Sequence, residues 1–287
     1  MDSTDFQLLV ELYGNARRSY QSLGRQVSLS APAVRDRVSR LMSKGILQGF
    51  MLTIDPSVFD RDDLLLFFHG NFSRKSVIAA FAAPEISWVA WKIDGRITLR
   101  LWTKNESEAI DNLRTILGVK PSMQAFTPRK KDRTPMSTSD LLIMDALVDE
   151  PKIPFAELLR HTRLSPKTLR KHLNQLLATK TISIDPLLGT LQDSGALIYP
   201  LVVAGRVGMD EIQRIMGEAT LTHHTLEPPM KHVLCRASSL AEVITRTRML
   251  ESVHGIKYVT ISLNRDVLVA TELRHSLIRD ELRKLKP

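Results

Sequence analysis

The 287-residue chain repeats itself at a fixed distance. The segment beginning at Ser30 reads SAPAVRDRVSRLMSKG, and the segment beginning at Ser165, 135 positions later, reads SPKTLRKHLNQLLATK. The same offset carries Leu23 to Leu158, and apolar residues fall on apolar residues along both copies. A repeated pattern is folded in a repeated way, so the chain has to be built from two similar halves.

Each half opens with a pattern of three helices. Amphipathic spacing predicts helices over 4–12 and 22–27 in the first half, and over 139–148 and 155–162 in the second. The third helix of each half is the repeated segment itself. Its initial serine is a good N-cap, because the hydroxyl accepts a hydrogen bond from a free amide of the first turn.

The third helices carry the same apolar stripe. Because residues three and four positions apart share a helix face, the stripe is expected to lie in the core. It comprises Val34, Val38, Leu41 and Met42 in the first half and Leu169, Leu173, Leu176 and Leu177 in the second. Beyond each helix, GILQGFMLTIDP and TISIDP are typical of a strand that ends at an Asp-Pro turn, as a wing requires. We therefore predict winged helix-turn-helix units over 1–56 and 138–186.

After each unit the pattern is strand, helix, strand, strand, helix, strand, which is the split βαβ or ferredoxin-like order. The predicted fold class is α+β, a tandem repeat in which each winged helix-turn-helix domain is followed by a ferredoxin-like βαββαβ domain. We place these domains at 62–128 and 195–287, with a linker at 129–137. A final helix is expected near the C-terminal end, with Leu277, Ile278, Leu282 and Leu285 on one side.

Two strands, at 64–68 and 197–203, are almost continuously apolar. Such a strand is usually buried on both faces, although the helices of its own domain cover only one. We therefore expect sheet to pack on sheet, either as an intramolecular pseudo-dimer or between two chains as a homodimer. The alternative is that these strands face only helices and the linker.

The net charge of +9 favours polyanionic partners such as nucleic acid. A single cysteine, Cys235, excludes an intramolecular disulfide and fits a reducing compartment. The acidic N-terminal stretch does not resemble a signal peptide, and no apolar run approaches the ~20 residues of a membrane span. We expect a cytoplasmic protein without a membrane partner.

These residues resemble the Lrp/AsnC family, the leucine-responsive and asparagine-synthesis regulators of bacteria and archaea. The likeness is strongest over 1–56, in MDSTDFQLLVEL, LSAPAVRDRVSRLMSKGIL and GFMLTIDP, and looser in LSPKTLRKHLNQL. The resemblance implies a DNA-binding transcription regulator, not an enzyme, whose α/β domains pair through their sheets. A tandem copy departs from the usual single unit, so the family's octameric assemblies are not carried over.

The family often binds a small effector such as an amino acid. Its members commonly have a glycine followed by acidic and aromatic residues between the middle strands of the α/β domain. KIDGRITL, with Asp94, Gly95 and Arg96, is a partial match, and LEPPMKHV hardly matches. These three residues are therefore candidate effector contacts, although a hairpin turn alone also explains Gly95.

A helix-turn-helix presents the outer face of its third helix to the major groove. The candidate DNA contacts are Ser30, Pro32, Ala33, Arg35, Asp36, Arg37, Ser39, Arg40 and Lys44 in the first unit, and Ser165, Lys167, Thr168, Arg170, Lys171, Asn174 and Gln175 in the second. Because the faces differ in chemistry, we predict an asymmetric operator on double-stranded DNA. Phosphate contacts are expected from Lys44, Arg160, Arg163 and the basic residues of 129–133. For each of these basic residues, the alternative is that it lies on a solvent-exposed helix face without contacting DNA.

Three other interpretations stay open. Siroheme decarboxylases have a similar architecture and use histidine and arginine around a tetrapyrrole. The Asn-Tyr pair expected after such a histidine is absent from THHTLEPP. A metal could be held by His223 or His224 with His232 and Cys235, although adjacent strand residues point to opposite faces. An architectural protein could coat DNA without selecting sequence. No cofactor is predicted.

Overall fold

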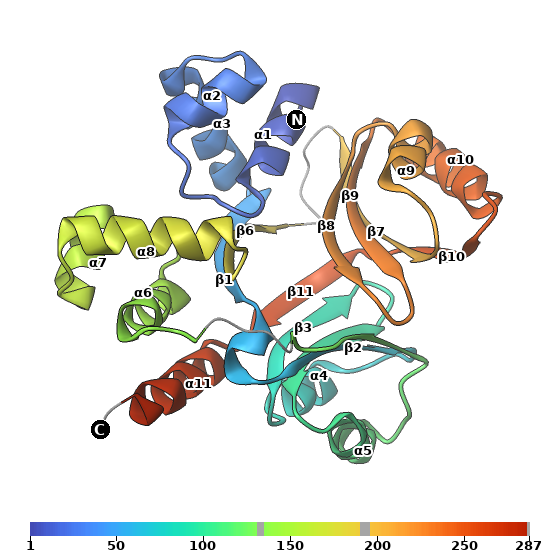
Figure 1. Cartoon of the computed structure of the whole chain (residues 1–287). Helices are drawn as coiled ribbons and strands as arrows, with labels where there is room; N and C mark the ends of the chain where they lie inside the picture. Colours follow the sequence, from blue (N-terminus) through green and yellow to red (C-terminus); the bar gives the residue numbers. More distant parts are fainter. Residues whose placement is uncertain (131–134, 190–195, 286–287) are drawn as a thin grey trace.

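The computed structural model describes residues 1–130, 135–189 and 196–285 (Figure 1). Both predicted helix-turn-helix units are confirmed. The first consists of α1 (Ser3–Leu12), α2 (Tyr20–Val27) and α3 (Ala31–Ser43), and the second of α6 (Thr138–Asp149), α7 (Phe155–Thr162) and α8 (Pro166–Ala178). No helix among the described residues is long and apolar enough to cross a membrane.

The strands after the two units pair with each other. β1 (Leu47–Ile54) and β6 (Ile182–Leu188) form an antiparallel two-stranded sheet in which Phe50 lies opposite Pro186 and Met51 opposite Asp185. In the repeat, Phe50 corresponds to Asp185 and Met51 to Pro186, so a pseudo-two-fold axis passes between these two pairs. The sequence predicted both strands but not that each would be the other's partner.

Both ferredoxin-like domains are confirmed as four-stranded antiparallel arrangements with two covering helices. The first contains η1 (Pro56–Phe59), β2 (Asp62–Phe68), α4 (Arg74–Phe81), β3 (Ile86–Lys92), β4 (Ile97–Thr103), α5 (Glu106–Leu117) and β5 (Met123–Thr127). The second contains β7 (Leu197–Gly205), α9 (Met209–Met216), β8 (Ala219–Thr225), β9 (Met230–Ala237), α10 (Leu240–Glu251) and β10 (Ile256–Ile261). The strand orders β3-β4-β2-β5 and β8-β9-β7-β10 are equivalent.

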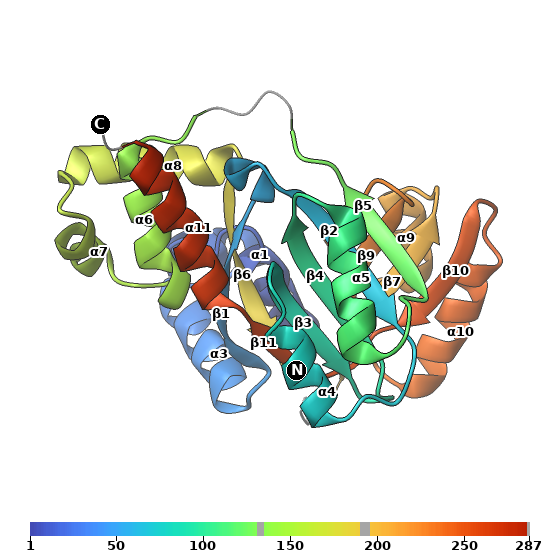
Figure 2. The same cartoon turned by 90° about the horizontal axis from the view of Figure 1, so that it is seen from below.

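The last elements return to the first half of the molecule. β11 (Asn264–Val269) pairs with β3 as a fifth strand of the first sheet, and α11 (Thr271–Lys284) continues to the second helix-turn-helix unit, where it packs against α6 (Figure 2). The predicted final helix is confirmed, with Leu277 and Ile278 buried, but Leu285 is 47% exposed. The part of 195–287 that follows β10 therefore lies outside the second ferredoxin-like sheet.

The two sheets pack face to face within one chain. Leu65, Phe67 and Ala125 of the first sheet form one buried cluster with Val202, Ala204 and Met230 of the second. The outer faces are covered by α4 and α5 on one side and by α9 and α10 on the other (Figure 1). Burial on both faces explains the continuously apolar strands and gives the intramolecular pseudo-dimer.

Candidate nucleic-acid interface

The helix-turn-helix turns have the same backbone in both units. The turn before α3 passes through Ser28 at φ 55°, and the turn before α8 passes through Arg163 at φ 55°. Ser30 then accepts a hydrogen bond from the Ala33 amide at 3.3 Å, and Ser165 accepts one from the Thr168 amide at 3.1 Å. Both caps predicted from the sequence are therefore formed, and they fix where each third helix begins.

The apolar stripe faces inward in both helices, with one exception. Six predicted core residues are buried at matching positions: Val34, Val38, Leu41, Leu169, Leu173 and Leu176. Met42 is 47% exposed, so its assignment to the core was wrong, and Leu177 is only partly buried. Each lies one position after a buried leucine, Leu41 or Leu176, and therefore at the edge of the stripe.

Most predicted DNA contacts lie on the exposed faces of α3 and α8. The fully exposed ones are Ser30, Pro32, Arg35, Asp36, Ser39, Arg40 and Lys44 in the first unit, and Ser165, Lys167, Arg170, Lys171, Asn174 and Gln175 in the second. Ala33, Arg37 and Thr168 are half-buried. The geometry thus leaves a polar, solvent-facing surface on each third helix.

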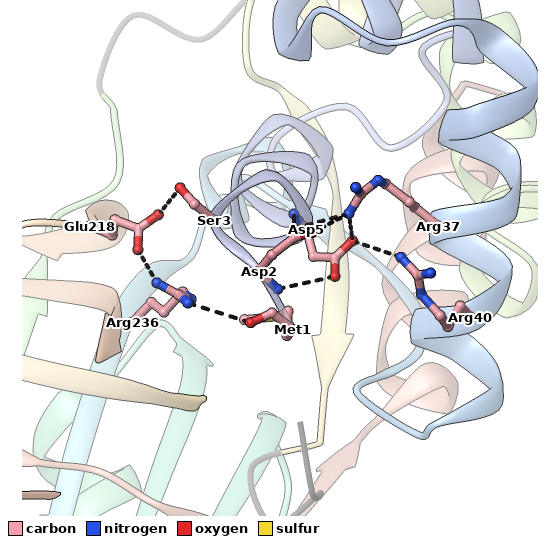
Figure 3. Close-up of polar contacts among 8 residues, drawn as sticks. All are labelled: Met1, Asp2, Ser3, Asp5, Arg37, Arg40, Glu218 and Arg236. Carbon is pink, nitrogen blue, oxygen red and sulfur yellow. Dashed lines mark hydrogen bonds and ion pairs between the residues drawn. The ribbon is translucent and has the colours of Figure 1, made fainter. Parts of the chain in front are cut away.

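Arg37 is engaged inside its own unit. Its guanidinium donates to Asp2 at 2.8 Å and to Asp5 at 2.7 Å, and Arg40 lies 3.5 Å from the same Asp5 carboxylate (Figure 3). Burial tends to raise the pKa of Asp2, but hydrogen bonds from Arg37 and the Asp5 amide, together with the charges of Arg37 and Arg40, lower it. Arg37 therefore ties α3 to α1, and its contact with DNA stays a prediction.

The second unit has the same tie with different chemistry. His172 and Asp140 occupy the positions that correspond to Arg37 and Asp5, and their side chains are 2.8 Å apart. Burial opposes ionisation of Asp140, yet hydrogen bonds from Ser137 and His172 lower its pKa. The Arg170 guanidinium lies over the Phe155 ring, 5.3 Å from its centroid. A single imidazole thus replaces the guanidinium that bridges two carboxylates in the first unit.

Different parts of the molecule hold the two units. Ser3 of α1 donates to Glu218, which pairs with Arg236 of β9, and Arg236 also donates to the Met1 carbonyl at 3.4 Å (Figure 3). The first unit is therefore attached to the second sheet.

The second unit is attached through α11 instead. His275 lies 2.7 Å from Asp145 and 3.0 Å from Asp149, both on α6. Burial acts to lower the pKa of His275, but the two carboxylates raise it above its usual range. Since α11 follows β11, the second unit is linked to the first sheet.

The units also contact each other. Arg17 donates to the Pro151 carbonyl at 3.0 Å, and the Lys152 ammonium lies 4.6 Å from the centre of the Phe50 ring. Gly14 donates to Asp185 at 2.8 Å. These contacts flank the β1–β6 sheet and hold α3 and α8 in a defined relation.

The residues predicted to touch phosphates differ in availability. Arg163 is exposed, and the Arg160 side chain is 74% exposed although it lies 3.2 Å from Glu157. Arg129 lies 3.5 Å from the Asp60 carboxylate, and Lys130 lies 2.6 Å from that of Asp55, so both are paired with acidic residues. Residues 131–133 of the predicted linker lie outside the described part of the chain.

The candidate effector turn is a hairpin between β3 and β4. Gly95 has φ 84°, and a Cβ there would lie 2.8 Å from the Asn71 Cα, so conformation and space alone require glycine. Asp94 pairs with Arg96 at 2.6 Å. Next to this turn, Lys92 and Arg96 line a pocket of about 360 Å³ between the sheets. Sequence reasoning missed Lys92, whose only signal is a basic residue ending an apolar strand.

The histidines proposed for a metal lie at the contact between the sheets. His223 and His232 are opposite each other on β8 and β9, with ring centres 5.6 Å apart, and burial lowers the pKa of each well below its usual value. Burial raises the pKa of the Cys235 thiol to about 12. Within the described residues, no three His, Cys, Asp or Glu side chains are grouped to hold an ion.

Residues 1–42 match the model of the AsnC-type helix-turn-helix domain, and residues 136–179 match that of a winged helix-turn-helix DNA-binding domain. The HTH-type transcriptional regulator Rv2324 of Mycobacterium tuberculosis is 34% identical over 90 residues, which cover 30% of this chain and 61% of the relative. The regulator Ptr1 of Methanocaldococcus jannaschii is 45% identical over 56 residues, or 20% and 38% of the two chains. These matches support the resemblance of the chain to Lrp/AsnC transcription regulators.

The chain spans less than two thirds of the length of these two curated relatives. A solved structure similar over the whole length is that of the siroheme decarboxylase NirDL, with a TM-score of 0.50, 13% identity, and coverage of 98% of this chain and 99% of that one. At this identity the likeness shows the fold alone. It extends to both halves of the tandem repeat, whereas the two curated relatives match much shorter stretches.

Proposed function

We propose that this protein is a cytoplasmic, sequence-specific transcription regulator of Lrp/AsnC type that reads double-stranded DNA with α3 and α8. The observation that carries the proposal is the pair of exposed third-helix faces on two units joined by the pseudo-symmetric β1–β6 sheet. Contacts between the units, such as Arg17 with Pro151, hold the helices in one relation. A fixed relation between two reading helices favours two half-sites at a fixed spacing.

The two half-sites are expected to differ. At corresponding positions, α3 presents Asp36 and Arg40 where α8 presents Lys171 and Gln175. Arginine pairs with guanine through two hydrogen bonds, whereas glutamine pairs with adenine. The proposed operator is therefore asymmetric, unlike the palindromes that symmetric dimers bind.

Selection of bound duplexes from a random pool, followed by footprinting, tests this function. We expect a preference over random duplex of about 10³-fold or more, as specific regulators show. Arg40→Ala should change base preference by about 1–3 kcal/mol, whereas Lys44→Ala should weaken all sequences alike. Equal affinity for every duplex would indicate an architectural coating protein. Binding of a tetrapyrrole without DNA binding would favour the decarboxylase-like alternative.

The regulator is also proposed to respond to a small effector at the β3–β4 turn. Support comes from Asp94, Gly95 and Arg96, which form that turn, and from the pocket beside it. The pocket lies between the two sheets, and each sheet is attached to a different DNA-reading unit. A ligand there would therefore act on the part of the molecule to which both units are connected.

A further inference from the structure

The pocket beside the β3–β4 turn is built from both halves of the chain. Its volume of about 360 Å³ lies within the range of small-molecule sites, roughly 300–1,000 Å³. Phe67, Met123 and Tyr258, which also belong to or pack against the cluster between the sheets, give it an apolar wall. Lys92 and Thr98 contribute polar groups. The site thus combines an apolar wall with a few polar side chains, as ligand sites do.

Lys92 is the unusual group in this pocket. Its residue is 6% exposed, and its ammonium donates to the Ser262 hydroxyl, with no ion-pair partner within 4.0 Å in the described part of the chain. The pKa of Lys92 is lowered to about 8, mainly by burial and secondly by the positive charge of Arg96. A buried cation without a carboxylate is costly, and an anion bound beside it would recover that cost.

Two neighbouring groups complete the arrangement. The Thr98 hydroxyl is buried and has no hydrogen-bond partner among the described residues. Arg96 is already paired with Asp94, and its remaining amino group lies 3.4 Å from the Thr260 hydroxyl. Lys92 and Thr98 are therefore the groups still available to a ligand's oxygen atoms.

The lining determines which kind of anion fits. None of the side chains that line the pocket is a carboxylate, and Asp94 is not among them. The ammonium of an amino acid would therefore face Lys92 and Arg96 without an acidic partner. We propose that the pocket binds a small carboxylate that carries an apolar, aromatic-sized group and no ammonium. This inference deepens, and depends on, the effector role proposed above.

The site is expected once per chain. The corresponding turn between β8 and β9 consists of Leu226, Glu227, Pro228 and Pro229, without a basic residue. The carboxylate of Glu227 would repel an anion there. One ligand per chain would therefore act on the asymmetric pseudo-dimer.

Lys92 also contacts the connection that leads to the second DNA-reading unit. Ser262 and Leu263 join β10 to β11, and the Leu263 carbonyl accepts a hydrogen bond from the Ile93 amide at 3.1 Å. A carboxylate on Lys92 would compete with Ser262. Since β11 continues into α11, this competition gives ligand binding a direct route to α6.

Calorimetric titration of the full-length protein, without DNA, tests the proposal with three matched compounds. Phenylacetate has the ring and the carboxylate, phenylalanine adds an ammonium, and phenethylamine has only the ammonium. We expect phenylacetate to bind one per chain and at least about tenfold more tightly than phenylalanine, since one unmatched buried charge is worth 1.4 kcal/mol or more. Phenethylamine should not bind.

Lys92→Met should weaken phenylacetate at least about tenfold, whereas the matched control Lys75→Met, on the exposed face of α4, should not change it. The wild-type protein provides a test that needs no variant. Its affinity should fall about tenfold or more between pH 7 and 9.5 as Lys92 loses its proton. The other charged or titratable groups at or beside the pocket are His69, Asp94, Arg96 and Tyr258. The pKa of Asp94 is lowered and that of Tyr258 is raised to about 12, so neither changes charge over this range.

Two results would overturn the proposal. Phenylalanine binding as tightly as phenylacetate would show that an ammonium is accommodated. No binding of phenylacetate, hexanoate or benzoate at millimolar concentration would show that the pocket does not take such carboxylates. Both are measured without DNA, so a failure of DNA binding in the separate selection experiment is distinguishable from either.

Discussion

The two helix-turn-helix units share a backbone but differ in what surrounds it. The N-caps, preceding turns and buried stripes of α3 and α8 match position for position, whereas Asp36 on α3 corresponds to Lys171 on α8. Helix α8 contains no acidic residue, so its outer face is the more basic of the two. Duplication has therefore preserved the residues that build the unit and changed those that would meet DNA.

Their attachments differ as well. The first unit reaches the second sheet through Ser3, Glu218 and Arg236, and the second reaches the first sheet through His275 on α11. The attachments are crossed, because each unit contacts the sheet of the opposite half or an element paired with it. The pocket is lined by strands of both sheets, and each sheet is attached to a different unit.

The largest expected effect comes from reversing the charge at corresponding positions of α3 and α8. Lys171→Asp should weaken operator binding about 10- to 100-fold, because it removes a cation from the major groove and adds a charge that repels phosphate. Asp36→Lys should strengthen binding to all duplexes and raise the salt slope by about 1. Fluorescence anisotropy at several salt concentrations measures both.

Lys75→Asp, on the exposed face of α4, is the control for a change in net charge. If Lys171→Asp left affinity and salt slope at the wild-type values, α8 would not contact DNA. The two units would then differ in role, and not only in base preference.

The next effect compares the ties between the first and third helices. The Asp5 side chain is 6% exposed and holds Arg37 and Arg40, whereas that of Asp140 is 13% exposed and holds only His172 on α8. Asp5→Asn should lower the free energy of unfolding by about 1–3 kcal/mol, since it leaves Arg37 with one carboxylate fewer in a half-buried site. Asp140→Asn should lower the free energy of unfolding by a smaller amount. Urea denaturation at pH 7 measures both, and equal losses would contradict the comparison.

The sequence predicted the repeated units well because their signals are local. Serine caps and helical spacing depend on neighbours a few positions away, and both recur at the offset of 135. The Asp-Pro signal is less reliable: Asp55-Pro56 follows β1, but Asp185-Pro186 lies inside β6, so the turn expected there was wrong. Met42 was misplaced because it lies at the edge of the apolar stripe, where helical spacing alone does not decide burial. The strand of NRDVLV was missed because a short, polar edge strand is defined by its partner, β3, 172 or more positions earlier in the chain.

The candidate site was predictable in part for the same reason. The exposed faces of α3 and α8 follow from the periodicity of each helix. The engagement of Arg37 by Asp2 and Asp5, and the burial of Lys92 between two sheets, follow from tertiary contacts. A pattern of residue types along one strand carries no signal for those contacts.

The smallest expected effect distinguishes the two attachments by their response to pH. The pKa of His275 is raised in the folded protein, so its contribution to stability is fully present below its unfolded value of about 6.5 and is lost as the pH rises through the folded value. The attachment of α11 to α6 should therefore weaken from pH 6 to 8, by less than about 1 kcal/mol for a partly exposed pair. The Glu218–Arg236 pair contains no histidine. Hydrogen exchange should then show α6 amides exchanging faster at pH 8 than at pH 6 after correction for intrinsic rates, with α1 amides unchanged.

His275→Gln should abolish the difference in α6. A pH response confined to α1 would reverse the assignment of the two attachments.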